Sequence, residues 1–174
     1  PVPPYDAAGW TLAYQMGVQF DRIMDGFEGP FEKNPLGQII KLTSTVVKNS
    51  TNGYVLDARI NQSYKAVNNL INSGVDVYRI NNTNTESAYS NGSFFIAAGA
   101  KAKSTIDKIV TENNVQFIAV DQKPTALSKI KKARIALWDT YGGSMPSGWV
   151  RLILEKFNYA FDVIYPKDID TGNL

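Results

Sequence analysis

The sequence predicts a three-layer α/β domain, built on a mostly parallel sheet with helices on both faces. Short apolar runs alternate with stretches of helical period from about residue 38 to the end of the 174-residue chain. Single helices between successive strands are typical of βαβ units, whose crossovers make neighbouring strands parallel. A hydrophobic fraction of 44% is that of a folded globular chain with a real core.

Residues 1–37 differ from the rest and predict an extended docking arm. Prolines and glycines there interrupt helices and strand ladders; among them are Pro1, Pro3, Pro4, Gly26, Gly29, Pro30 and Pro35. Large apolar residues nevertheless alternate, at Trp10, Leu12, Tyr14, Met16, Val18 and Phe20. That period of two is typical of a strand with one buried face. A free linker would not carry aromatic residues at this density, so we expect the arm to pack on a neighbouring surface.

In the first half of the domain, the pattern predicts strands at 39–42, 53–58 and 75–80. A helix between the last two would bury one face, formed by Tyr64, Val67, Leu70 and Ile71. Asn61 is its expected N-cap, because a short polar side chain can accept from an early helix N–H. Gly74 suits the left-handed position after the helix. A polar, turn-forming loop is expected at 81–91.

In the second half, strands are predicted at 93–97, 115–120, 133–138 and 161–165, with a connector at 124–130. A helix at 104–114 would bury Ile106, Ile109 and Val110, and one at 149–157 would bury Val150, Ile153, Leu154 and Phe157. The whole arrangement resembles flavodoxin-like folds. A doubly wound sheet normally continues beyond a strand like the last one, at 161–165. The domain over 38–174 is therefore expected to be incomplete at its C-terminal end.

The chain contains neither histidine nor cysteine, which removes much of the usual catalytic chemistry. No imidazole is present to move protons near neutral pH, and no thiolate to act as a nucleophile. Ser-His-Asp and Cys-His arrangements and Cys/His zinc sites are excluded for the same reason. We therefore expect no catalytic residue, no metal ligand and no cofactor in this chain.

The charge balance and hydropathy exclude two partner classes. With 18 basic and 16 acidic residues the net charge is only +2, which gives no electrostatic case for nucleic acid. The one basic cluster, at 129–134, fits either a solvated loop or a phosphate-binding patch. No apolar run reaches the roughly 18 residues that a membrane span needs.

Three aspartates fall at the carboxyl ends of predicted strands: Asp57, Asp121 and Asp139. In a parallel sheet, the carboxyl ends of the strands form the ligand-binding edge. Clustered carboxylates there could hold Mg²⁺ for phosphate chemistry, as in a receiver-like module. The other interpretation is that each is an ordinary turn or capping residue.

The glycine-rich loop before the last helix is the best candidate for ligand binding. Its candidate ligand-binding residues are Tyr141, Gly142, Gly143, Ser144 and Ser147. The glycines would let a ligand approach the backbone, and the helix N-terminus behind them offers unpaired N–H groups. A structural turn, with Ser147 as the helix cap, is the alternative. Ser144 is no nucleophile elbow, because Pro146 stands where the motif needs glycine and no histidine can activate it.

Three tryptophans could serve a glycan partner or a core. Trp10, Trp138 and Trp149 could form a flat carbohydrate platform, but burial in the core or under the arm is the commoner use of aromatic residues.

Both ends of the chain resemble a group of bacterial zinc carboxypeptidase-like proteins (carboxypeptidase A-type metallopeptidases). The stretches Pro3–Leu12 and Gln15–Val18 resemble the segment that follows the catalytic domain there. A later part of those proteins is similar to Ala133–Trp138, Gly143–Met145 and Gly148-Trp149, and to Leu152–Phe157, Asp168-Ile169 and Gly172–Leu174.

The resemblance implies a C-terminal accessory region. The zinc-binding catalytic domain of such proteins lies upstream, and the downstream part looks like a class I glutamine amidotransferase-like domain. That enzyme class uses a Cys-His-Glu triad. A chain without cysteine and histidine would therefore be a degenerate, non-catalytic relative. The resemblance further implies a periplasmic or extracellular bacterial protein. Its partner would be its own catalytic domain, or a peptide or glycan.

Overall fold

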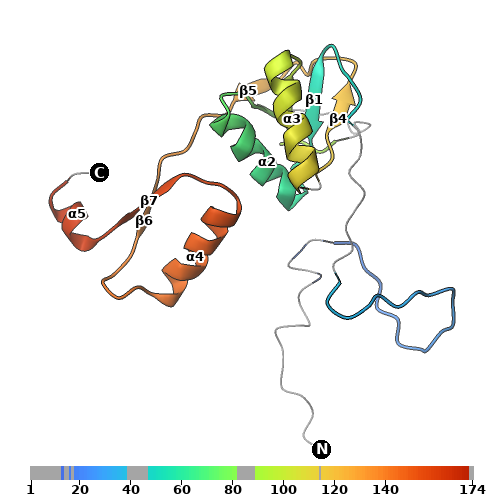
Figure 1. Cartoon of the computed structure of the whole chain (residues 1–174), viewed down its shortest axis with the longest axis horizontal. Coiled ribbons are helices and arrows are strands. Elements are labelled where there is room, and N and C mark those ends of the chain that lie inside the picture. The colour runs from blue at the N-terminus through green and yellow to red at the C-terminus, as the bar shows by residue number, and fades with distance from the viewer. Residues whose placement is uncertain are drawn as a thin grey trace, which may run out of the picture. The chain divides into compact units, whose positions relative to one another are not determined.

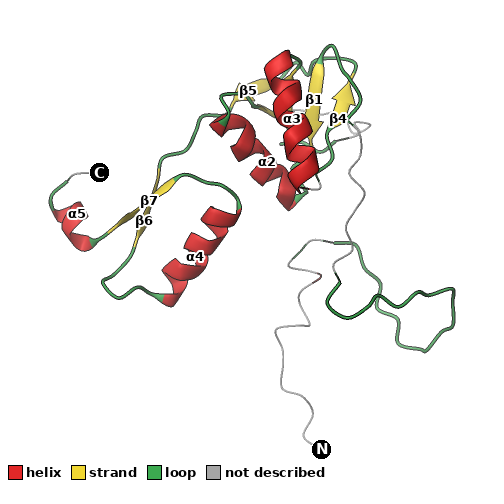
Figure 2. Cartoon of the chain, in the orientation of Figure 1, coloured by secondary structure: helices red, strands yellow, loops and turns green. Residues whose placement is uncertain are grey.

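A computed structural model of the chain describes residues 13, 16, 18–38, 47–81, 89–113 and 115–172. The chain divides into two units, Pro1–Ile39 and Ile40–Leu174. Figure 1 traces the chain with its elements labelled, and Figure 2 marks its helices and strands. The strand predicted at 39–42, and most of the loop predicted at 81–91, lie outside the described residues.

In the first unit, the described residues 18–38 form irregular backbone. Of the residues that predicted an alternating strand, Trp10, Leu12 and Tyr14 are outside the described part, and residues 18–20 are not in a strand. Phe27 and Phe31 make an edge-to-face ring contact, with centroids 5.3 Å apart. Several large apolar side chains of this unit are exposed, among them Ile23, Met24, Phe27, Phe31 and Leu36.

The second unit contains a five-stranded sheet in which every pair of neighbours is antiparallel. Its strands are β1 (Gly53–Leu56), β2 (Tyr78–Ile80), β3 (Phe94–Ala97), β4 (Ile118–Val120) and β5 (Leu127–Lys129). They lie in the order β4-β1-β3-β2-β5. The prediction of a mostly parallel sheet, flavodoxin-like or class I glutamine amidotransferase-like, is therefore wrong.

The connections made by helices α2 (Asn61–Asn72) and α3 (Ala100–Asn113) explain why the sheet is antiparallel. Helix α2 joins β1 to β2, which are parallel to each other but have β3 between them. In the same way α3 joins β3 to β4, with β1 between them. These are two interleaved split βαβ units, the ferredoxin-like arrangement, extended at one edge by β5. Each crossover skips one strand, and an antiparallel strand fills the gap.

Helices α2 and α3 pack against each other on one face of this sheet, as Figure 1 shows. The prediction that Ile106, Ile109 and Val110 share a buried face of a helix is confirmed. They pack in one core with side chains from both helices and the sheet, including Leu56, Leu70 and Ile96. Because successive strand residues point to opposite faces, Val55, Ile80 and Phe95 form a second, smaller cluster on the other side.

A separate two-stranded sheet follows along the chain. Strand β6 (Ile135–Trp138) pairs in parallel with β7 (Phe161–Ile164), and α4 (Met145–Lys156) connects them. A short helix, α5 (Pro166–Asp170), comes after β7. Among the described strands, this is the one parallel pair.

Several local predictions fail at element boundaries. Ile60, not Asn61, is the N-cap of α2, and it makes no side-chain capping bond. The predicted connector at 124–130 contains β5, whose three residues extend the sheet beyond β2. Gly74 does adopt the predicted left-handed backbone, with φ +70°. Within the described ranges, no helix is long and apolar enough to cross a membrane.

Candidate functional site

The predicted ligand-binding loop connects β6 to α4, but the helix begins four residues earlier than expected. It starts at Met145 instead of Trp149, so Ser147 and Gly148 belong to its first turn. Ser144 is the N-cap: its backbone is extended and its Oγ accepts from the Ser147 N–H at 3.2 Å. The interpretation of Ser147 as the cap is therefore wrong. Pro146 suits the first turn, because its missing N–H would have no helical partner there.

The two loop glycines are open to solvent and conformationally special. Gly142 and Gly143 have φ values of +89° and +78°, which L side chains rarely adopt. No atom lies within 4 Å of the position that a side chain would take on either residue. The Gly143 N–H donates to the Thr140 carbonyl at 2.9 Å, which closes the turn. The backbone of both glycines is therefore open on this side.

The polar groups of the loop are largely satisfied by the protein itself. The Asp139 carboxylate accepts from the Thr140 N–H at 2.8 Å. The Ser147 hydroxyl beside it, followed by the Thr140 N–H, lowers the pKa of Asp139 from its ordinary value. A carboxylate at a helix N-terminus is also favoured by the helix dipole. Asp139 thus takes the position in which an anionic ligand would sit, and its lowered pKa makes it a weak general base near neutral pH.

The Ser147 hydroxyl has one proton and two acceptors within reach. It lies 2.9 Å from the Ser144 carbonyl oxygen and beside the Asp139 carboxylate. The Ser144 hydroxyl in turn donates to Ser147 Oγ at 2.9 Å. Both hydroxyls are therefore engaged in hydrogen bonds at the N-terminus of α4. The remaining predicted site residue, Tyr141, is 88% exposed and stacks on Tyr165 with ring centroids 5.2 Å apart.

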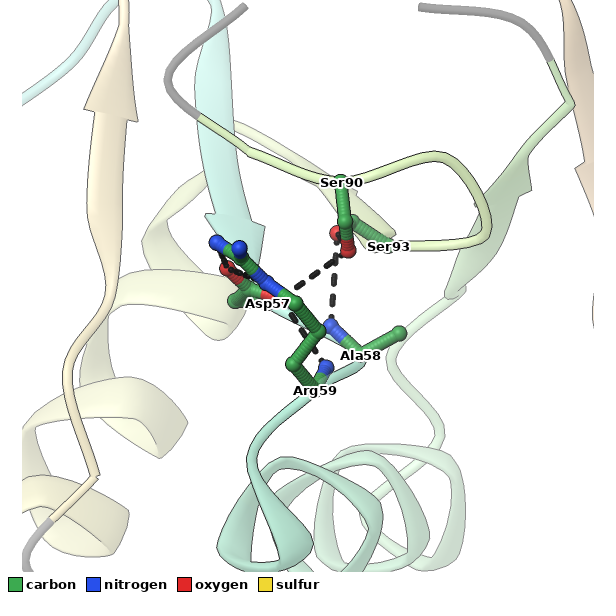
Figure 3. A network of polar contacts seen from close by, with 5 residues as sticks. All are labelled: Asp57, Ala58, Arg59, Ser90 and Ser93. Atoms are coloured by element: carbon green, nitrogen blue, oxygen red, sulfur yellow. Dashed lines mark hydrogen bonds and ion pairs between the residues drawn. The ribbon is translucent and has the colours of Figure 1, made fainter. Parts of the chain in front are cut away.

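Asp57 is held in a polar network of its own (Figure 3). Its two carboxylate oxygens accept from the Arg59 guanidinium at 2.6–3.1 Å, and Oδ1 also accepts from the Arg59 N–H at 2.9 Å. The Ser90 hydroxyl donates to Oδ1 at 3.0 Å, and Ser93 Oγ accepts from the Ala58 N–H at 3.3 Å. The Arg59 guanidinium, the first of these partners, lowers the pKa of Asp57 to about 2. The network ties the end of β1 to the residues before β3.

The three strand-end aspartates do not form one site. The pairing of Gly53 with Val120 places Asp121 at the end of β1 opposite Asp57. The Asn52 side chain donates to the Asp121 carbonyl there, at 2.6 Å. Asp139 follows β6, in the other sheet. The prediction of a shared carboxylate edge assumed parallel strands, and antiparallel pairing sends Asp57 and Asp121 to opposite ends. In the described ranges no group of three or more acidic side chains is placed to hold a metal ion.

Helix α4 is apolar on most of its surface and largely uncovered. Its outer stripe has the spacing i, i+4, i+7, i+8, and its exposed fractions are 79% for Met145, 63% for Trp149, 38% for Leu152 and 56% for Ile153. Of the four residues predicted to face inward, Leu154 and Phe157 are half-buried, whereas Val150 and Ile153 are exposed. Of the two uses expected for the tryptophans, core burial is wrong for Trp138 and Trp149, which are exposed, and Trp10 is not described. We call the four-residue stripe the α4 apolar face.

A cavity of about 230 Å³ was not predicted from the sequence. Helix α2, strands β2 and β3, the segment 130–133 and the turn 158–160 line it. Three cations are among its lining residues: Arg79, Lys131 and Lys132. The sequence held one signal for it, because Arg79 follows Val75 and Val77 at the spacing of one strand face, where a buried strand would carry another apolar residue.

Comparisons of the chain with protein-family models, with curated proteins and with solved structures find no match.

Proposed function

We propose that this chain is a non-catalytic accessory domain of a zinc carboxypeptidase-like protein, and that it acts by docking on the catalytic domain. The resemblance of its two ends to such proteins supplies the partner. The α4 apolar face is the observation on which the proposal rests, since it is the kind of surface that such docking requires.

A helix that is apolar over most of its circumference is normally buried. Leu154 of α4 and the C-cap Phe157 are half-buried, whereas Trp149 and Ile153 remain exposed. Burial of a large apolar side chain contributes about 1.5–3 kcal/mol. Covering the α4 apolar face would therefore supply a substantial part of the free energy of a stable interface, in which tryptophan is typically an anchor.

The described candidate sites add indirect support. Asp139, Ser144 and Ser147 hydrogen-bond with one another at the N-terminus of α4, and Asp57 is engaged by Arg59. A hydroxyl nucleophile requires an adjacent base, and a carboxylate with a lowered pKa is a poor one. These groups therefore act in this interpretation as structural residues that hold α4 and the β1–α2 turn in place.

The experiment is a binding titration of this chain with a separately produced catalytic domain of the same family, followed by calorimetry. Trp149→Ser and Ile153→Ser should each weaken docking about tenfold or more, because each removes an apolar anchor. Lys108→Gln, an exposed change on α3, is the matched control and should leave the affinity unchanged.

Equal affinity for the Trp149→Ser variant and the unchanged chain would overturn the role of the α4 apolar face. Absence of any docking would overturn the choice of partner, and self-association through the same face in sedimentation would identify a second copy as the occupant. Peptide hydrolysis by this chain alone, in the presence of zinc, would contradict the non-catalytic function.

A further inference from the structure

The cavity beside α2 is bounded by wall segments that hydrogen bonds hold in place. Asn68 Nδ2 donates to the Phe157 carbonyl at 2.8 Å, and Asn158 Nδ2 donates to Asn69 Oδ1 at 2.6 Å. The turn at 158–160 is thereby fastened to α2. On the other side, the Ile130 N–H donates to the Val77 carbonyl at 2.9 Å, which fixes the start of the segment 130–133 against β2. The lining is therefore preformed and does not depend on a ligand to assemble it.

The charged residues that line the cavity in the described ranges are all basic. Arg79, Lys131 and Lys132 line it, and none of the described Asp or Glu residues does. None of the three forms an ion pair with a described residue, whereas the neighbouring Lys129 pairs with Asp76 at 2.8 Å. The Arg79 guanidinium lies over Gly92, where an added side-chain carbon would come within 3.0 Å of it. The cations lining this cavity therefore have no anion among the described residues.

The remainder of the lining is largely apolar. Tyr64 and Phe94 meet edge to face, with ring centroids 5.3 Å apart, and Val67, Ile71 and Ile130 add aliphatic surface beside them. The Asn68 and Asn72 side-chain amides also line the cavity, but both already donate to backbone carbonyls of the 157–158 turn. An apolar floor with a few charged groups is the usual composition of a small-molecule site.

We propose that this cavity binds a small amphiphilic anion. Its carboxylate or phosphate group contacts Arg79, Lys131 and Lys132, and its aromatic or aliphatic body lies on Phe94, Val67 and Ile130. The volume of about 230 Å³ is below the roughly 300–1,000 Å³ of sites for drug-sized ligands, so the ligand is of one- or two-ring size. This inference is independent of the proposed docking function, which uses a different surface.

The test is calorimetric or NMR titration of the whole chain with three probes: 2-naphthoate, 1-naphthyl phosphate and the neutral 2-naphthamide. At least one anionic probe should bind about tenfold or more tightly than the amide, because charge-assisted hydrogen bonds are the stronger ones. Comparison of the two anions then distinguishes a carboxylate ligand from a phosphate ligand. The affinity of the anion should also fall as salt is raised.

Arg79→Gln should weaken binding of the anion about tenfold and leave binding of the amide unchanged. Lys129→Gln is the matched control, since Lys129 lies in the same basic cluster but does not line the cavity, and it should change the affinity less than twofold. Lys131→Gln is the second variant, for use if Arg79→Gln alters the melting temperature. The proposal is overturned if neither anion binds at millimolar concentration, if the amide binds as tightly as the anions, or if both cavity variants bind like the unchanged chain.

Discussion

Replacement of Asp57 by asparagine should destabilise the domain and remove part of its pH dependence. The Asp57 side chain is only 11% exposed and accepts from the Arg59 guanidinium, the Arg59 N–H and the Ser90 hydroxyl. Asparagine keeps the shape but removes the negative charge and one acceptor. Arg59 then loses its anionic partner in the network that joins the β1–α2 turn to the residues before β3.

The magnitude follows from the pKa of Asp57, which Arg59 lowers from 3.8 to about 2. At 1.36 kcal/mol for each pKa unit, the charged form would contribute about 2.5 kcal/mol to the free energy of unfolding. Arg59 is 72% exposed, so solvent screening reduces this to about 1–2 kcal/mol. The dependence of stability on pH is that of a carboxyl group whose pKa is lower in the folded state than in the unfolded state. Its stabilisation is complete above the unfolded-state pKa near 4, and is lost as the pH falls through the folded-state value of about 2.

The assay is urea unfolding of the two proteins at pH 7 and at steps down to pH 2.5. We expect a gap of about 1–2 kcal/mol at pH 7 that narrows below pH 4. Asp76→Asn is the matched control, because its ion pair with Lys129 is exposed at both ends and should contribute under about 1 kcal/mol. Equal stability of Asp57→Asn and the unchanged chain at pH 7, or a gap that stays constant down to pH 2.5, would refute the reasoning.

Three further changes test the backbone and the β6–α4 loop. Gly53→Ala should cost more than about 2 kcal/mol of unfolding free energy in urea, because φ is +152° and a side chain there would collide with the Ile96 carbonyl; wild-type stability would contradict this. Ser144→Ala should cost about 1 kcal/mol through loss of the α4 cap, measured as a lower midpoint of thermal unfolding, with the exposed change Thr171→Ala as comparison. Ser147→Ala should raise the pKa of Asp139 toward its ordinary value in a carboxyl NMR titration, since the Ser147 hydroxyl is the main cause of its lowering, and an unchanged pKa would argue against that contact.

Local order of elements was predictable because it depends on the period of apolar residues. The buried face of α3 at Ile106, Ile109 and Val110 follows directly from the helical period, and the strand at Phe94–Ala97 follows from a short apolar run. Strand partners were not predictable in this way. The pattern strand-helix-strand is the same whether the second strand lies beside the first or one position further on, and here both crossovers skip a strand. Strand β5 was missed because three residues, Leu127–Lys129, are too few to show a period.

The candidate sites also combine features that a local pattern predicts with features that depend on distant residues. The glycine-rich turn at Tyr141–Ser144 was predictable because glycine and serine mark a strand-to-helix turn in any fold. The place of the Asp139 carboxylate at the N-terminus of α4 could not be predicted, because it depends on side-chain geometry. The cavity at Arg79, Lys131 and Lys132 brings together residues about 50 positions apart, and no local pattern joins them.

The amino-acid sequence alone excluded histidine- and cysteine-based chemistry and placed most helices and strands, because composition and local period are properties of neighbouring residues. Only the tertiary structure decided that the larger sheet is antiparallel, that the three aspartates are dispersed and that the α4 apolar face is exposed. The physical reason is that pairing and burial depend on which distant segments meet. That outcome is set by packing of the whole chain and leaves no signature in any one stretch of it.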